Sequence, residues 1–67
     1  MTVEDIKVLF YTYEIGNNEV MVVVGGVRAF ISSDNKITIV YPGQEAIEIN
    51  SLRELVSLLE IAELDLV

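Results

Sequence analysis

The chain has 67 residues, of which 52% are hydrophobic, and eleven acidic residues against four basic ones give it a net charge of −7. It contains no cysteine and no histidine, which excludes disulfides, zinc fingers and nucleophilic catalysis through a thiolate or a histidine base. The acidic balance also argues against direct binding to nucleic acids or to an anionic membrane surface, because both are negatively charged themselves.

This length predicts a single domain over residues 1–67, near the lower size limit for a chain that folds without help. Small domains usually rely on disulfides, a metal or a partner subunit, and here the high apolar content favours self-association. We therefore expect a homo-oligomer. The first residues carry acids where a secretory signal has bases, and no apolar run is long enough to cross a bilayer, so a cytoplasmic location is expected.

The first fifteen residues support two interpretations. Thr2 and Asp5 have the spacing of a capping box, which begins a helix. Apolar side chains then recur at helical spacing at Val3, Ile6, Phe10 and Tyr13. In contrast, residues 10–15 are rich in the aromatic and β-branched side chains that favour strands. We predict a strand over residues 6–15, with one preceding helical turn as an open alternative.

Glycine, asparagine and proline then divide the chain into short apolar segments. Residues 16–18, Gly-Asn-Asn, predict a reversal. The run Val20–Val24 is apolar on both faces, as in a central strand covered on both sides. The Gly25-Gly26 pair predicts either a two-residue hairpin turn or a sharp bend.

Three further strands are predicted, at residues 27–31, 37–41 and 46–49. Between the first two lies a polar loop whose Asp34-Asn35 pair suits a hairpin turn. Between the last two, Pro42-Gly43 predicts a type I or type II turn, because proline fixes φ and glycine supplies the reversal. All the connections are short, so successive strands should pair antiparallel.

The C-terminal segment from Ser51 onwards is the clearest helix. Ser51 and Glu54 form a second capping-box pattern. The following apolar residues share one helical face: Leu52, Leu55, Val56, Leu58, Leu59 and Ala62. The predicted fold class is α+β, a small antiparallel β-meander of about five short strands with one C-terminal helix packed on the sheet. One helix covers one sheet face, so the other face would be exposed in a monomer.

No pattern for catalysis or for cofactor binding stands out. Ser51 and Ser57 are explained as a helix cap and a polar helix position, and Gly25-Gly26 lacks the flanking residues of a phosphate-binding loop. Glu45 and Glu48 alternate with apolar residues, as on a solvated strand edge. We expect no enzymatic activity, no metal and no cofactor. The aromatic residues are assigned to the core or to an interface, because base-stacking surfaces normally lie in a basic groove.

The end of the helix provides the candidate binding site for a partner protein. Acidic side chains there are unusual, because the C-terminus is the negative end of the helix dipole. Ile61 and Leu64 fall on the polar side of the helix. Either the helix stops near Ala62 and the tail turns inward, or these two residues form a second apolar contact. The proposed partner-binding residues are Glu60, Ile61, Glu63, Leu64 and Asp65.

Small size, acidity and absence of catalytic patterns favour a non-enzymatic protein-binding module. Such a module could be a virus- or plasmid-encoded inhibitor, of the anti-CRISPR or anti-restriction type, whose carboxylates occlude a basic surface of a host protein that handles nucleic acid. The alternative is a homo-oligomeric structural or assembly protein that uses the exposed apolar sheet face. A third interpretation assigns the charge to solubility alone.

Overall fold

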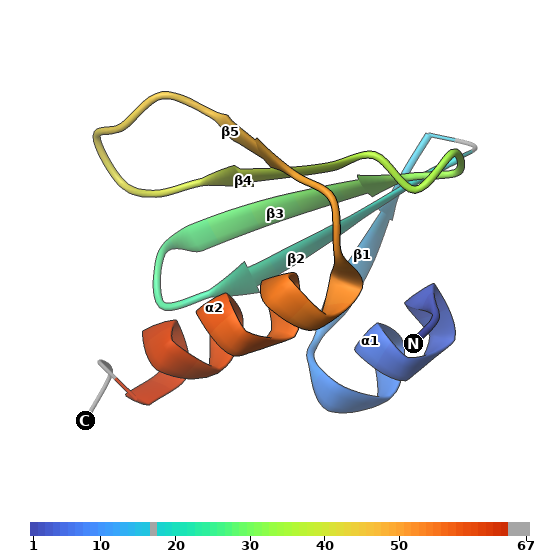
Figure 1. Cartoon of the computed structure of the whole chain (residues 1–67), viewed down its shortest axis with the longest axis horizontal. Coiled ribbons are helices and arrows are strands. Elements are labelled where there is room, and N and C mark those ends of the chain that lie inside the picture. Colours follow the sequence, from blue (N-terminus) through green and yellow to red (C-terminus); the bar gives the residue numbers. More distant parts are fainter. Residues whose placement is uncertain (17, 65–67) are drawn as a thin grey trace.

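In the computed structural model, residues 1–16 and 18–64 are described, and they form two helices and five strands (Figure 1). In chain order the elements are α1 (Val3–Leu9), β1 (Thr12–Ile15), β2 (Glu19–Val24), β3 (Val27–Ser32), β4 (Ile37–Val40), β5 (Ile47–Ile49) and α2 (Leu52–Leu64). The strands form one antiparallel sheet in the order β1-β2-β3-β4-β5. The predicted meander and the α+β class are therefore confirmed.

The tight turns follow the predicted chemistry. Val24 pairs directly with Val27, so Gly25 and Gly26 form a two-residue hairpin loop, and their φ angles of 57° and 82° are those of a type I′ turn. Gly43 has a φ of 72°, and the N–H of Gln44 donates to the carbonyl of Tyr41 at 3.1 Å. This geometry is a type II turn. The reversal predicted at residues 16–18 joins β1 to β2, with Asn17 outside the described residues.

The N-terminal segment differs from the predicted strand over residues 6–15. Residues 3–9 form helix α1, and a strand is present only from Thr12. The Asp5 carboxylate accepts a hydrogen bond from the backbone N–H of Thr2 at 2.8 Å, which fixes the first turn. Ile6 is fully buried, so helical spacing and packing prevail over the strand preference of the neighbouring aromatic residues.

Both helices lie on the same side of the sheet, where the prediction had placed only one (Figure 1). The core fills the space between this inner face and the helices. Its buried residues are Ile6, Val22, Val24, Val27, Ala29, Ile31, Ile37, Ile39, Ile49, Leu55, Val56, Leu59 and Ala62. The molecule is therefore a two-layer structure, and no second layer covers the outer face of the described sheet.

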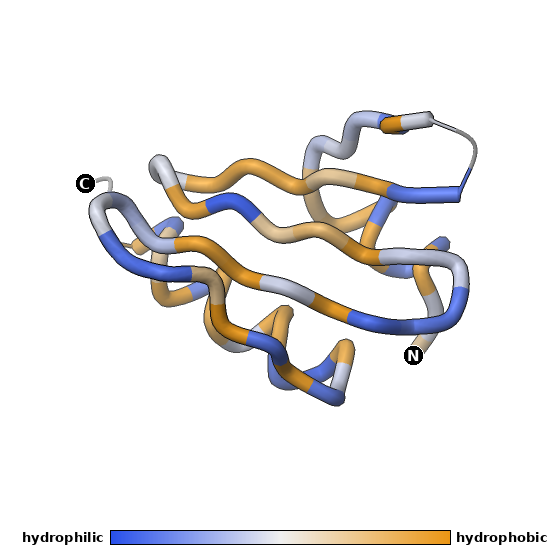
Figure 2. Tube along the Cα trace, turned by 90° about the horizontal axis from the view of Figure 1, so that it is seen from above, coloured by the Kyte–Doolittle hydropathy of each residue, from blue (hydrophilic) through white to orange (hydrophobic). Residues whose placement is uncertain are grey.

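Strand β2 is consequently covered on one face only in the single chain, and its other face is exposed, as the sequence predicts for a monomer. Val22 and Val24 point into the core, while Val23 on the outer face keeps 37% of its surface exposed. Seen from above, hydrophobic segments run along the strands and hydrophilic ones gather at the loops (Figure 2). Successive side chains along each strand point to opposite faces, so one face of the sheet is buried and the other is exposed.

Helix α2 begins as the sequence predicts. The Ser51 hydroxyl accepts a hydrogen bond from the N–H of Glu54 at 3.3 Å, which makes Ser51 the N-cap. The predicted apolar face is buried or partly buried against the core. The helix continues through Leu64, so the alternative of an end near Ala62 is wrong. Ile61 and Leu64 therefore remain on the helix surface, where they are 57% and 72% exposed.

Candidate partner-binding surface

The second half of α2 brings four of the predicted partner-binding residues to the surface. Glu60, Ile61, Glu63 and Leu64 are all exposed, and Asp65 lies outside the described residues. With about 100° between successive helix positions, Glu60 and Glu63 lie on one flank, Ile61 on the other, and Leu64 between them. These residues therefore form an acidic flank beside an apolar one.

The apolar flank borders a hollow of about 260 Å³. Helix α2 provides one wall, and the β2–β3 and β4–β5 connections provide the other. The lining residues are Gly25, Val27, Tyr41, Pro42, Leu58, Ile61 and Ala62. No Asp, Glu, Lys or Arg is among them, so this hollow is suited to an apolar side chain. We call it the α2 hollow.

Beside the α2 hollow, edge strand β5 leaves inner-face surface uncovered. Ile47 pairs with the buried Ile39 and shares its face, yet 47% of Ile47 is exposed. The reason is the position of α2, which packs on β2, β3 and β4. Extending the β4–β5 register places Tyr41 diagonally from Ile47 on the inner face. An apolar strip therefore continues from the hollow towards the free edge of β5.

Acidic side chains lie near this strip. Glu45 in the β4–β5 connection is exposed, and Glu48 of β5 is exposed on the opposite face of the sheet, as expected for a solvated edge. Glu54 is also exposed, and it precedes Leu58 by four positions and Ile61 by seven, so it belongs to the same stripe of α2. The sequence predicted the exposed acidic residues but not the α2 hollow, because the two walls of the hollow come from segments far apart in the chain.

These carboxylates lack internal counter-charges. Within the described part of the chain, the ion pairs are those of Lys7, with Glu4 at 3.6 Å and with Glu14 at 3.7 Å. The first pair lies within α1 and the second joins α1 to β1, which is the sheet edge opposite β5. The charge at β5 and at the end of α2 is therefore free to act on a partner through solvent.

Asp34 in the β3–β4 loop has an internal role. Its carboxylate accepts hydrogen bonds from the Ser32 hydroxyl and from the backbone N–H of Lys36. The Ser32 hydrogen bond in particular lowers the pKa of Asp34 below its ordinary value. The loop also contains Asn35 with a φ of 65°, a left-handed conformation that asparagine tolerates. This carboxylate stabilises a turn.

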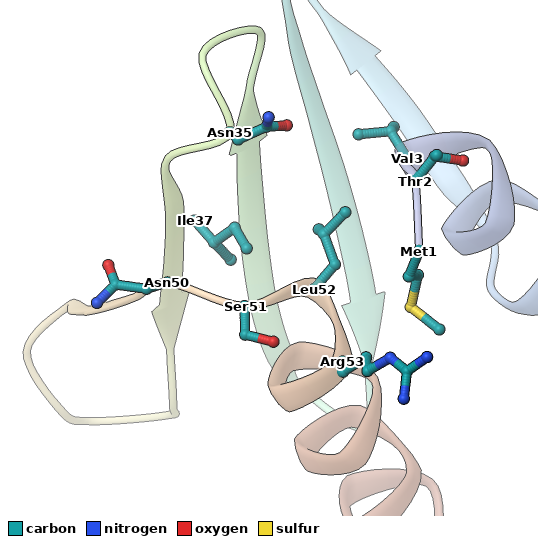
Figure 3. Close-up of a pocket in the computed structure, with 9 residues that line it drawn as sticks. All are labelled: Met1, Thr2, Val3, Asn35, Ile37, Asn50, Ser51, Leu52 and Arg53. Carbon is teal, nitrogen blue, oxygen red and sulfur yellow. The ribbon is translucent and has the colours of Figure 1, made fainter.

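A larger hollow of about 470 Å³ lies between the N-terminal ends of the two helices and the β3–β4 loop (Figure 3). Asn35 and Asn50 lie on one side of it, and Met1 and Arg53 on the other (Figure 3). The Ser51 hydroxyl at its base already accepts the Glu54 N–H. Buried polar side chains are lacking from the described residues, and the polar side chains that line this hollow are all exposed.

The described residues hold no group of three or more acidic side chains close enough to share a metal ion. Neither helix that the structure describes has the length and apolar character needed to cross a membrane. What the site offers is packing surface, backbone hydrogen-bonding groups at a sheet edge, and uncompensated negative charge. Comparisons with protein-family models, with curated proteins and with solved structures gave no match to this chain.

Proposed function

We propose that this chain is a small, acidic, non-enzymatic module that binds another protein and occludes or bridges one of its surfaces. The observation that supports this proposal is exposed apolar surface beside carboxylates that have no internal cation, at α2 and at β5. Protein interfaces combine these features, because apolar contact supplies affinity and charge guides the approach.

The partner is proposed to present a basic surface. Since the chain carries −7 at neutral pH, it competes with phosphate groups for surfaces rich in lysine and arginine. A nucleic-acid-handling protein of a host cell fits this description, with the chain acting as a virus- or plasmid-encoded inhibitor of the anti-CRISPR or anti-restriction type.

The test is affinity capture from the native host, followed by competition. A captured partner should release nucleic acid when this chain is added, and its association rate should fall steeply as salt screens the charges. Replacing Glu60 and Glu63 with Gln keeps side-chain shape and removes two charges, so association at low salt should be slower. A partner that binds nucleic acid and this chain simultaneously would contradict occlusion.

A second candidate function is homo-oligomeric assembly through the outer sheet face. This face carries Tyr13, Met21 and Phe30 in one cross-strand row, with Val23 and Val40 beside it. Tyr11 extends the apolar surface, with its ring centroid 5.8 Å from that of Tyr13. Tyr13 is exposed while Met21 and Phe30 are half-buried, and a partly exposed apolar row of this kind is compatible with an interaction surface.

The size of this face predicts a weak self-contact. Strands of three to six residues, about 4.8 Å apart and on average about 15 Å long, give the five-stranded sheet a flat area of roughly 300 Å². Stable interfaces bury about 800 Å² per partner. A dimer should therefore appear only at high concentration. Light scattering that gives the 7.5 kDa monomer mass up to near-millimolar concentration would contradict this candidate.

A further inference from the structure

We propose that the free edge of β5 is the docking site for an extended basic segment of the partner, which adds to the sheet as a further antiparallel or parallel strand. This inference rests on the proposed function and specifies its site. Strand β5 is the last strand of the described sheet and pairs with β4 on one side only. Its outward backbone N–H and C=O groups are thus available for main-chain hydrogen bonds, which is how sheets recruit extended peptides.

The pattern of β5 defines the chemistry of the added strand. Ile47 and Ile49 face the inner side and Glu48 faces the outer side. Directly opposed side chains on neighbouring strands contact each other, so the partner strand should place apolar residues beside Ile47 and a lysine or arginine beside Glu48. The complementary sequence is an alternation of apolar and basic residues.

The α2 hollow extends this recognition. An apolar side chain on the inner face of the added strand lies on the same side as the strip formed by Ile47 and Tyr41. A long side chain there could reach towards Leu58 and Ile61, which line the hollow. Burying that side chain removes apolar area from water, which adds affinity and specificity to the backbone contacts.

Charge disfavours a second copy as the occupant of this edge. Pairing β5 with β5 of another molecule would bring the carboxylates of Glu45 and Glu48 towards the same groups of its partner. Like charges on neighbouring strands destabilise the pairing, whereas a basic strand is attracted. The other sheet edge is less suitable, because the inner-face Glu14 of β1 is engaged by Lys7 of α1. The geometry thus favours a basic strand at β5.

The experiment uses the full chain, nitrogen-labelled for NMR, and a synthetic peptide of alternating lysine and valine as the probe. We expect shifts of the backbone amides of β5 and of Ile61, with slower hydrogen exchange at the edge. Two control peptides are N-methylated at every second residue, in the two possible alternations. Methylation removes the backbone donors from one edge of the extended peptide, so only the peptide methylated on the edge that faces β5 should lose binding. Absence of shifts at β5 at peptide concentrations up to ~1 mM would overturn the proposal, since a dissociation constant above ~1 mM is too weak for specific recognition.

Two charge reversals localise the effect. Glu48→Lys and Glu60→Lys change the net charge equally, but only the first lies on the edge strand. Glu48→Lys should weaken peptide binding by about tenfold relative to Glu60→Lys, because the attraction between Glu48 and the basic residue beside it is exchanged for repulsion. Equal weakening by both variants would mean that the peptide responds to overall charge alone, and would overturn the site.

The same variants separate this inference from the proposed function. A captured partner whose affinity is insensitive to Glu48→Lys and sensitive to Glu60→Lys would leave the protein-binding function standing and remove β5 from it. Failure to displace nucleic acid from any partner, with peptide still bound at β5, would instead remove the occlusion function. The melting temperature of each variant is also measured, so that a loss of binding caused by unfolding is recognised.

Discussion

Replacing the buried Ile6 with alanine tests whether α1 is an integral part of the core. Ile6 is fully buried between the helix and the sheet, whereas Val8 in the same helix is 86% exposed. Truncation of a buried isoleucine costs about 2–5 kcal/mol of unfolding free energy. Because α1 is short and lies at the periphery, partial collapse around the new cavity is feasible, and we expect about 2–3 kcal/mol.

That cost is large for a chain of this size. A stability of roughly 0.05–0.15 kcal/mol per residue gives ~3–10 kcal/mol for the whole domain. Each kcal/mol corresponds to about 4–8 °C in melting temperature, so Ile6→Ala should melt about 10–20 °C lower than the unmodified chain. Circular dichroism during thermal and urea denaturation provides both quantities.

Val8→Ala is the matched control, and the pair distinguishes helix from strand. In a strand, residues two apart share a face and should respond alike. In a helix, Ile6 and Val8 lie on nearly opposite sides, so Val8→Ala should change stability by no more than about 0.5 kcal/mol. Comparable losses for both variants, or no loss for Ile6→Ala, would refute the packing of α1 described above.

Ser51→Ala removes the N-cap of α2 and should lower the unfolding free energy by about 1 kcal/mol, whereas an unchanged melting temperature would mean that the hydroxyl does not cap the helix. Gly26→Ala forces a Cβ into a φ of 82° and should cost about 1–2 kcal/mol, measured by urea denaturation beside the better-tolerated Gly26→Asn. The lowered pKa of Asp34 means that its stabilising contribution is present above the ordinary aspartate pKa and is lost as pH falls through the folded value. An NMR titration of this carboxyl carbon should give a pKa below that of the unfolded chain, and Ser32→Ala should remove most of the difference.

Local signals allowed much of this fold to be predicted. The turns at Gly25-Gly26 and Pro42-Gly43 depend on backbone conformations that few residues accept, so they are visible in the sequence itself. Helix α2 combined a cap, a helical period and sufficient length. The register of a meander with short connections then follows with few alternatives.

The errors arose where distant packing decides the structure. A seven-residue helix is marginal on its own, so α1 depends on the burial of Ile6 against strands that come later in the chain. The α2 hollow likewise requires Tyr41 and Ile61 to line the same hollow, and no periodicity encodes that arrangement. The exposed acids were predicted, but their grouping around β5 became apparent only from the sheet order.

The two proposed associations should respond in opposite ways to salt, because they use surfaces of different charge. The strands place Glu19, Arg28 and Glu48 on the outer face, so two acids against one base leave it with one net negative charge out of the −7 of the chain. Self-association there is opposed mainly by the repulsion between whole molecules, which salt weakens. Binding of a basic strand at β5 depends on attraction, which salt also weakens. Raising ionic strength from about 0.1 M to about 1 M shortens the screening length from ~10 Å to ~3 Å. The dimer fraction should then rise while peptide affinity falls, and a peptide affinity that is unchanged across this range would contradict charge complementarity at the edge.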